Sequence, residues 1–293
     1  MTLAEVLAQV RRLELRSRRL ARELLAGEYA SAFKGRGVEF ADVRPYVIGD
    51  DVRTIDWRVT ARTGEAYVRR YVEERELTIM LAVDRSASDA FGSARRTKAD
   101  LATELCATLA LTAARTSDRV GAVLFTDRVE RYLPPEKGMR HALRVVREMV
   151  AFEPSGTGTD VAAALEFVSR VARRRVVLFV MSDWIATGWE HALTLIAQRH
   201  DTIAVQLADP RERELPDVGL VALADPESER WRWVDTGDAR VREHLRAAAH
   251  ERDAALARAL RRHGADVVRL RTDRGYVAPL LALFRARERM PRH

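Results

Sequence analysis

The chain has 293 residues, enough for one large domain with an added segment and a sizeable buried core. Its formal net charge is +7, but 43 acidic residues are interspersed among 50 basic ones, which argues against a surface built for nucleic acid. A single cysteine excludes a disulfide framework and a thiolate metal cluster, and no apolar stretch reaches the roughly 18–20 residues of a membrane span. We therefore expect a cytoplasmic protein without membrane helices.

The first part of the chain, residues 1–75, reads as a helix followed by an irregular or β segment. Apolar residues recur at helical spacing over residues 3–26 and predict a helix there. Glycine and proline then punctuate short extended runs, Val38–Phe40 and Tyr67–Val72. We interpret Trp57 as a packing anchor. A group of charged residues is interpreted as an ion-pair network that docks this segment on the sheet: Arg44, Asp50, Asp51, Arg53, Asp56 and Arg62.

From residue 76 to about residue 272, apolar strand-like runs alternate with helical patterns. The strands are expected at Thr78–Val83, Val120–Phe125, Val176–Met181, Thr202–Leu207 and Asp266–Leu270. The helices are expected at Thr97–Arg115, Met139–Phe152, Val161–Ala172, Trp189–Arg199 and Ala239–His263. This alternation predicts an α/β domain, a doubly wound and mostly parallel sheet covered on both faces. The run Arg128–Leu133 predicts one antiparallel edge strand, and residues 273–293 a C-terminal helix or tail that packs back.

Polar side chains occur where buried strands end. "DRSAS" places Asp84, Ser86 and Ser88 after the first apolar run, and another run ends in Ser182-Asp183. Ligands bind at the carboxyl ends of strands in open α/β sheets. Carboxylates and hydroxyls without His or Cys suit Mg²⁺ or Mn²⁺. The alternative is that these residues cap helices: Ser86 or Ser88 for the helix that follows, and Asp160 for the helix at Val161.

Three short motifs, "DRSAS", "GTGTD" and "MSDW", resemble the loops of a metal-ion-dependent adhesion site in von Willebrand factor type A domains. This resemblance covers about residues 76–272 and implies a Rossmann-like fold. It also implies a set of metal ligands, which by position are Asp84, Ser86, Ser88, Thr159 and Asp183. Two departures stand out. Thr157 competes with Thr159 as the ligand of the second loop, and Trp184 stands where glycine often follows the acid.

The segment "GRGVEFADVRPYVIGDDVRTIDWRVTAR" resembles the signature of the bacterial "domain of unknown function 58" family. That resemblance implies a MoxR-type AAA+ ATPase as partner. The main hypothesis is a non-enzymatic, Mg²⁺-dependent protein–protein interaction module that acts in chaperone-like complex assembly or maturation. A partner's Asp or Glu carboxylate would complete the coordination of the ion.

Two other classes of function remain open from the sequence. A metal-dependent phosphoester hydrolase would use Asp84 and Asp183, with Asp160 and Asp89 as further acids. Phosphate-loop, dinucleotide and His-Glu-x-x-His motifs are missing, and so we do not expect an enzyme. An arginine-rich nucleic-acid binder would instead lose affinity steeply with added salt.

Overall fold

A computed structural model describes residues 3–20, 26–33, 39–72, 76–94, 96–224 and 231–289. In this part of the chain the central element is a six-stranded sheet with the order β10-β7-β6-β3-β4-β5. Every neighbouring pair is parallel except β4 and β5, which pair antiparallel. The predicted fold class is therefore confirmed. The strands are β3 (Thr78–Asp84), β4 (Arg119–Phe125), β5 (Val129–Lys137), β6 (Val177–Ser182), β7 (Asp201–Ala208) and β10 (Asp266–Arg271).

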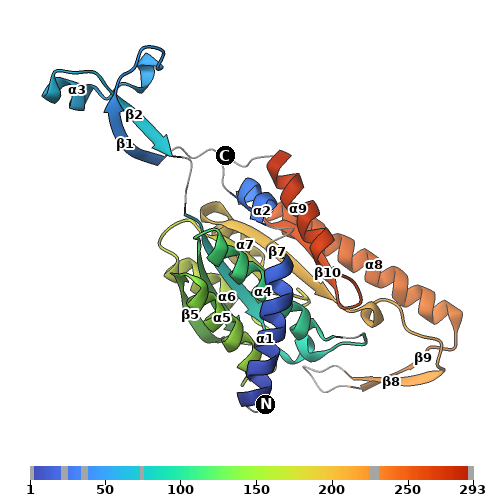
Figure 1. The fold of residues 1–293 in the computed structure, drawn as a ribbon. Coiled ribbons are helices and arrows are strands. Elements are labelled where there is room, and N and C mark those ends of the chain that lie inside the picture. The colour runs from blue at the N-terminus through green and yellow to red at the C-terminus, as the bar shows by residue number, and fades with distance from the viewer. Residues whose placement is uncertain are drawn as a thin grey trace.

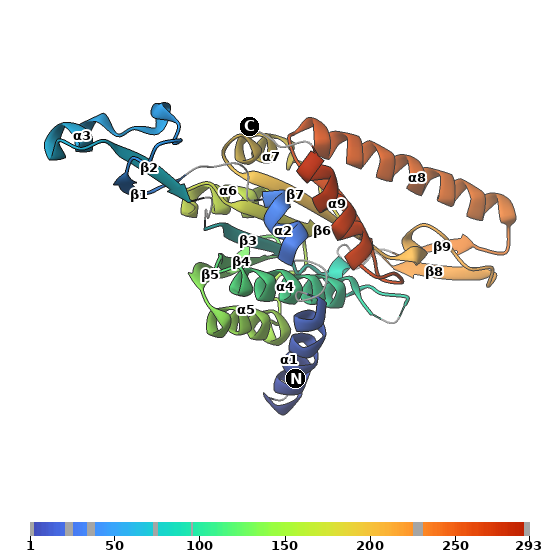
Figure 2. The same ribbon diagram turned by 45° about the horizontal axis from the view of Figure 1, so that its top comes forward.

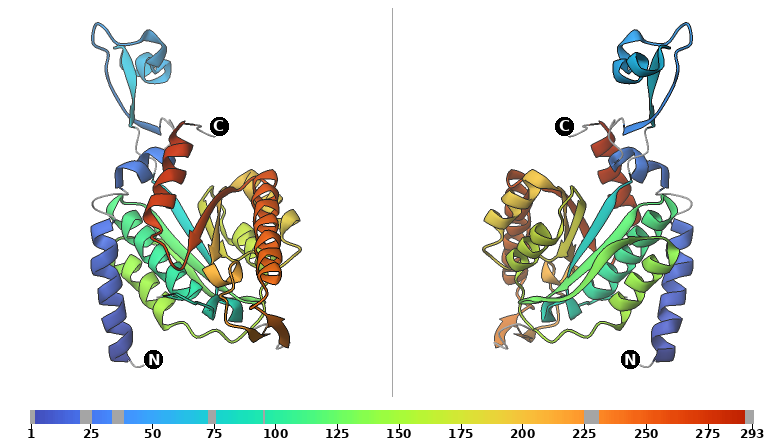
Figure 3. Two further views of the ribbon diagram at one scale, coloured as in Figure 1. Left: turned by 90° about the vertical axis from the view of Figure 1, so that its right-hand side faces the viewer. Right: turned by 90° about the vertical axis from the view of Figure 1, so that its left-hand side faces the viewer.

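Helices cover both faces of this sheet, as Figure 3 shows. Side chains alternate along β3, so that Ile79 and Leu81 enter one core cluster while Met80 and Ala82 enter the other. This explains why β3 reads as an unbroken apolar run: each face meets its own layer of helices. The first layer includes α4 (Lys98–Arg115), α5 (Met139–Ala151) and α9 (Val277–Arg289). The second includes α6 (Val161–Val171), α7 (Glu190–Arg199) and α8 (Ala239–Arg262).

The order of the strands places two loops side by side. The chain runs from β3 outward through β4 to β5, and then returns to the other side of β3 to form β6, β7 and β10. Strands β3 and β6 are parallel neighbours, with Val83 opposite Met181. Their carboxyl ends therefore meet where the strand order reverses, which is where open α/β sheets bind ligands.

Helix α1 spans Leu3–Leu20 and helix α2 spans Ala26–Phe33. Helix α1 lies within the predicted helix over residues 3–26, whose residues 21–25 lie outside the described ranges. Helix α2 packs on α9 through aromatic contacts, with the rings of Phe33 and Phe284 5.2 Å apart. A C-terminal helix that packs back is thus present. The domain boundaries near residues 75 and 272 stay predictions.

A hairpin of β1 (Glu39–Pro45) and β2 (Tyr67–Val72) projects from the body, as Figures 1 and 2 show. The loop between its strands carries η2 (Val52–Thr54) and α3 (Trp57–Thr63). The Arg44 guanidinium pairs with Asp50 at 2.7 Å inside this hairpin, and Asp51 and Asp56 cap η2 and α3. Trp57 is 70% exposed. The interpretations of Trp57 as a packing anchor and of the charges as a dock on the sheet are therefore wrong.

A second hairpin was not predicted. Strands β8 (Leu220–Ala224) and β9 (Trp231–Asp235) pair antiparallel between β7 and α8, on the side where β7 ends (Figure 1). Leu220–Ala224 reads as a short apolar run in the sequence, yet the described side chains of both strands are largely exposed. Within the ranges that the structure describes, none of the helices combines the length and the hydropathy that crossing a membrane requires.

Candidate metal centre

The first loop turns sharply after β3. Asp84 ends the strand and is 1% exposed, and its Oδ1 accepts a hydrogen bond of 2.9 Å from the Ser86 backbone N–H. This bond curls the chain into a short 3₁₀ turn, η3 (Ala87–Ala90). Ser86 stands at the N-cap of η3, but its side chain makes no capping bond. The Ser86 Oγ instead lies 3.1 Å from the Ser88 Oγ, so both hydroxyls face one side of the turn.

The end of β6 meets this turn. The Ser182 Oγ donates to Asp84 Oδ2 at 2.7 Å, and the Ser88 Oγ donates to Asp183 Oδ2 at 2.9 Å. Asp183 Oδ1 accepts from the Ile185 N–H at 3.1 Å. These contacts join four of the five predicted ligands, Asp84, Ser86, Ser88 and Asp183, in one cluster at the switch point of the sheet.

Trp184 adopts an unusual backbone conformation at this corner. Its φ is 61°, in the left-handed region that favours glycine. That conformation explains why glycine would be expected after the acid. The indole compensates for the strain, because it is buried, donates from Nε1 to the Val205 carbonyl at 3.3 Å and lies edge-on to Trp189. Asp183 is thus aimed at the cluster by a strained but well-packed residue.

The second loop reaches the first through its backbone. The Thr157 carbonyl accepts a hydrogen bond from the Ala87 N–H at 2.9 Å, while the Thr157 side chain is exposed. Glu130 anchors the loop from β5, because its carboxylate accepts bonds from the backbone N–H groups of Ser155 and Gly156. Thr159 is partly buried two residues beyond Thr157. Asp160 caps α6 through Ala163 N–H at 2.8 Å, as the capping interpretation predicted.

Burial disfavours the charged form of two acids in this cluster, Asp84 and Asp89. Burial raises the pKa of Asp84 to about 6 against the hydrogen bonds that lower it, and the nearby Asp183 charge adds to the rise. Asp89 is buried beside them, and burial together with the Asp84 charge raises its pKa well above the ordinary value. One of its oxygens, Oδ2, has no hydrogen-bond partner among the described residues. Buried carboxylates in this arrangement favour a cation nearby.

Lys98 is a functional candidate that sequence reasoning missed. Its side chain is 1% exposed, and its ammonium lies 2.8 Å from Asp183 Oδ2 and 2.8 Å from Glu212 Oε1. Burial opposes its charge, but the two carboxylates outweigh burial and raise the pKa of Lys98. A signal existed in the sequence: Lys34, Lys98 and Lys137 are the only lysines in an arginine-rich chain.

The donor set fits a hard divalent cation. Adjacent ligands of an octahedral Mg²⁺ lie about 2.9 Å apart, since each sits 2.0–2.1 Å from the ion. The spacings from Ser86 Oγ to Ser88 Oγ and from Ser88 Oγ to Asp183 Oδ2, 3.1 and 2.9 Å, match that value. No three His, Cys, Asp or Glu side chains form a metal-binding group in the described part of the chain. An ion here would need the hydroxyls as well.

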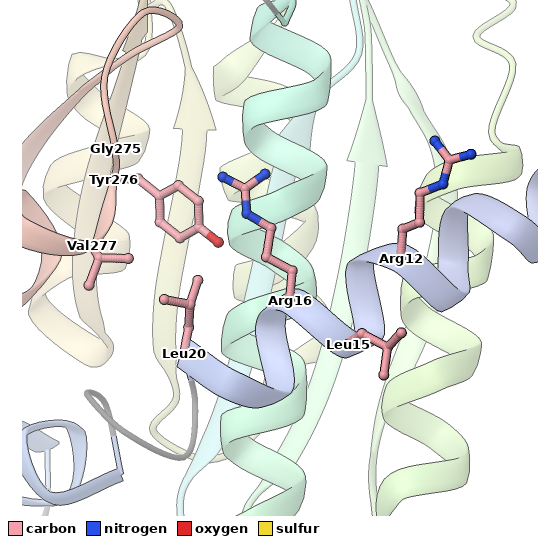
Figure 4. Close-up of a pocket in the computed structure, with 7 residues that line it drawn as sticks. All are labelled: Arg12, Leu15, Arg16, Leu20, Gly275, Tyr276 and Val277. Atoms are coloured by element: carbon pink, nitrogen blue, oxygen red, sulfur yellow. The ribbon is translucent and has the colours of Figure 1, made fainter.

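A separate hollow of about 730 Å³ lies between α1 and the start of α9 (Figure 4). Two of its lining residues already join elements: Arg16 pairs with Glu104 at 2.8 Å, and the Tyr276 hydroxyl lies 2.8 Å from Thr108 Oγ1. The hollow contains none of the predicted metal ligands and is a seam between α1 and the body. Its lining is Arg12, Leu15, Arg16, Leu20, Gly275, Tyr276 and Val277.

Comparison with known proteins points to one family. The sequence profile described as "Protein of unknown function DUF58" matches residues 42–255. The "Uncharacterized protein Mb1516" of Mycobacterium bovis is 36% identical over 285 residues, covering 96% of this chain and 90% of the relative.

Solved structures resemble the chain more distantly. The conserved hypothetical protein BatB from Bacteroides thetaiotaomicron is 13% identical with a TM-score of 0.47, covering 73% of this chain and 99% of that one. The SpRpn10 VWA domain is 12% identical with a TM-score of 0.39, covering 71% and 94%.

Proposed function

Since the chain belongs to the family described as "Protein of unknown function DUF58", we propose that it is a protein-interaction module whose binding depends on Mg²⁺ or Mn²⁺. One observation carries the proposal: carboxylates and hydroxyls from the ends of β3 and β6 lie within hydrogen-bond distance of one another at the switch point. The spacing of these oxygens suits a hard cation, and the edge of the sheet suits a ligand.

The residues divide the work between charge and geometry. Asp84 and Asp183 would supply the negative charge, and Ser86, Ser88 and Thr159 would supply neutral oxygens. Because hydroxyls bring little charge, the two carboxylates only just balance the charge of a bound divalent ion. The ion can therefore still attract a carboxylate from outside. A partner's Asp or Glu then gives a charge-assisted and geometrically demanding contact.

The partner that we propose is a MoxR-type AAA+ ATPase or a protein on which it acts, and the role is chaperone-like assembly or maturation of complexes. This part of the proposal is supported by the resemblance of the segment "GRGVEFADVRPYVIGDDVRTIDWRVTAR" to the signature of its family. We place phosphoester hydrolysis second, because Asp160, one of the two further acids it would need, is engaged in capping α6.

Calorimetric titration with Mg²⁺ and Mn²⁺ tests the site. The variants are Asp84→Asn, Ser88→Ala and the control Asp217→Ala, whose carboxylate pairs with Arg242 on the surface. We expect saturable binding in the unchanged protein and in the control, weaker binding in Ser88→Ala and none in Asp84→Asn. Equal affinities for the metal ion in all four proteins would show that Asp84 and Ser88 are not ligands.

Interaction measurements with a purified MoxR-type ATPase test the partner. The affinity is compared in Mg²⁺ and in a chelator, for the unchanged protein and for Asp84→Asn. We expect binding only with metal and only with Asp84 present. Binding of the same strength in the chelator would contradict metal dependence, whereas no binding in either condition would rule out this partner.

A further inference from the structure

Lys98 stands at a position where a cation is costly. It is the first residue of α4, and a helix N-terminus carries a partial positive charge that disfavours an ammonium. Its side chain is also almost wholly buried, and burial disfavours any charge. Two unfavourable conditions at one residue require strong compensation, which the carboxylates of Asp183 and Glu212 provide at 2.8 Å each.

The ammonium uses the oxygen that a metal would need. Asp183 Oδ2 accepts a hydrogen bond from the Ser88 hydroxyl at 2.9 Å and another from Lys98 Nζ at 2.8 Å. Asp183, a predicted ligand, is therefore already paired with a positive charge supplied by the chain itself. A divalent ion that binds Asp183 through Oδ2 must share that oxygen with the ammonium or displace it.

Glu212 offers the ammonium a second position. It lies in η4 (Pro210–Glu212), the turn after β7, and its other oxygen accepts from the Asp209 N–H at 2.9 Å. The Glu212 carboxylate is thus held in place by the backbone while Oε1 stays on Lys98. An ammonium that leaves Asp183 remains paired at Glu212, and no buried charge is stranded.

We propose that Lys98 is a built-in counter-cation of this site: it holds Asp183 and Ser88 in place without metal and competes with Mg²⁺ for Asp183. The inference rests on the proposed function and adds a residue that regulates the binding of Mg²⁺. The competing ammonium lowers the affinity for Mg²⁺ and keeps the cluster assembled when the ion is absent. Glu212 is the residue that receives the ammonium when the ion binds.

The primary test is Lys98→Met, which keeps the apolar stem of the side chain and removes the charge. We expect the affinity for Mg²⁺, measured by calorimetry, to rise about tenfold or more, because a positive charge beside the ion is removed. We expect the melting temperature in chelator to fall and saturating Mg²⁺ to restore most of the loss. The matched control is Lys137→Met, which removes an exposed lysine paired with Glu76 and should leave the Mg²⁺ affinity unchanged.

A second variant has the opposite expected sign. Glu212→Gln leaves the ammonium dependent on Asp183 alone, so we expect weaker Mg²⁺ binding. Weaker binding in Glu212→Gln could also come directly from the loss of a negative charge near the ion. The double variant Lys98→Met/Glu212→Gln distinguishes that effect from one that acts through Lys98. If Glu212 acts through Lys98, the effect of Glu212→Gln largely disappears in the Lys98→Met background.

The outcomes distinguish this proposal from the proposed function. Equal Mg²⁺ affinity in the unchanged protein and Lys98→Met, with the same loss of melting temperature in chelator and in Mg²⁺, makes Lys98 a purely structural ion pair and overturns this proposal alone. Binding of Mg²⁺ in neither protein overturns both proposals. Tighter binding in Lys98→Met, with no change in Lys137→Met, supports both.

Discussion

Two buried aspartates at the same edge of the sheet have opposite surroundings. Asp209, just after β7, accepts hydrogen bonds from the Ser93 N–H and Oγ, from the Arg211 N–H at 2.9 Å and from the Thr272 Oγ1 at 2.6 Å. Burial opposes its ionisation, but these donors outweigh burial and lower the pKa of Asp209. For Asp84, at the end of β3, burial outweighs the donors and the pKa rises to about 6.

The difference indicates that Asp209 has a structural role, whereas Asp84 is suited to bind a metal ion. The fold itself supplies hydrogen-bond donors to the Asp209 carboxylate. Through Ser93 and Thr272, these bonds connect the end of β7 to the segment after η3 and to the end of β10. Asp84 instead has the Asp183 carboxylate nearby, and the Lys98 ammonium that pairs with Asp183 is shared with Glu212. A carboxylate cluster with too little positive charge favours the binding of an external cation.

The largest change in stability is expected at Asp209, the aspartate whose oxygens are fully hydrogen-bonded by the fold. Asp209→Ala removes the acceptor of several buried donors, and we expect the free energy of unfolding to fall by about 3 kcal/mol or more. Urea unfolding in Mg²⁺ and in chelator measures this loss, which should be the same in both. A loss confined to the Mg²⁺ sample would place Asp209 in the metal site and break the contrast.

Asp84→Asn should show the reverse pattern. Without metal we expect stability to change by no more than about 1 kcal/mol, because the variant loses hydrogen-bond strength but also a buried charge. In Mg²⁺ at roughly 100 times Kd, the unchanged protein gains about 2.7 kcal/mol and the variant gains none. Thermal unfolding with and without Mg²⁺ gives both values. Equal stabilisation of the two proteins would show that Asp84 is no ligand.

Trp184 tests how the end of β6 is held. Trp184→Gly and Trp184→Ala both lose the buried indole, but only alanine retains the strain of a left-handed backbone. We expect the glycine variant to be more stable than the alanine variant by about 1 kcal/mol. Chemical denaturation of the pair measures that difference. Equal stabilities would mean that the corner relaxes once the indole is gone.

The smallest effect concerns the second loop and acid pH. Burial would raise the pKa of Glu130, but hydrogen bonds from Thr126, Ser155 and Gly156 outweigh it and lower the pKa from 4.5 to about 2. A depressed pKa contributes stability that is present above pH 4.5 and is lost as the pH falls toward about 2. The stability difference between the unchanged protein and Glu130→Gln should therefore shrink over that window. A difference independent of pH would show that the carboxylate charge does not anchor the loop.

Much of the fold follows from local patterns. The expected strand Thr78–Val83 appears as β3, and the expected helix Thr97–Arg115 appears as α4 one residue shorter. Apolar runs and helical spacing are properties of neighbouring residues, and both survive folding because the sheet is covered on both faces. The hairpin β8–β9 was missed although Leu220–Ala224 is an apolar run, because it forms a separate two-stranded sheet whose described side chains are largely exposed.

The amino-acid sequence by itself determined the succession of strands and helices and the acids and hydroxyls at the strand ends, because each depends on residues close together in the chain. Only the tertiary structure decided that Ser88 meets Asp183 and that Lys98, 85 residues before Asp183, supplies a cation to it. It also decided that Trp57 faces solvent on a projecting hairpin. Such contacts join residues far apart in the chain, and they depend on which strands become neighbours and which faces are covered.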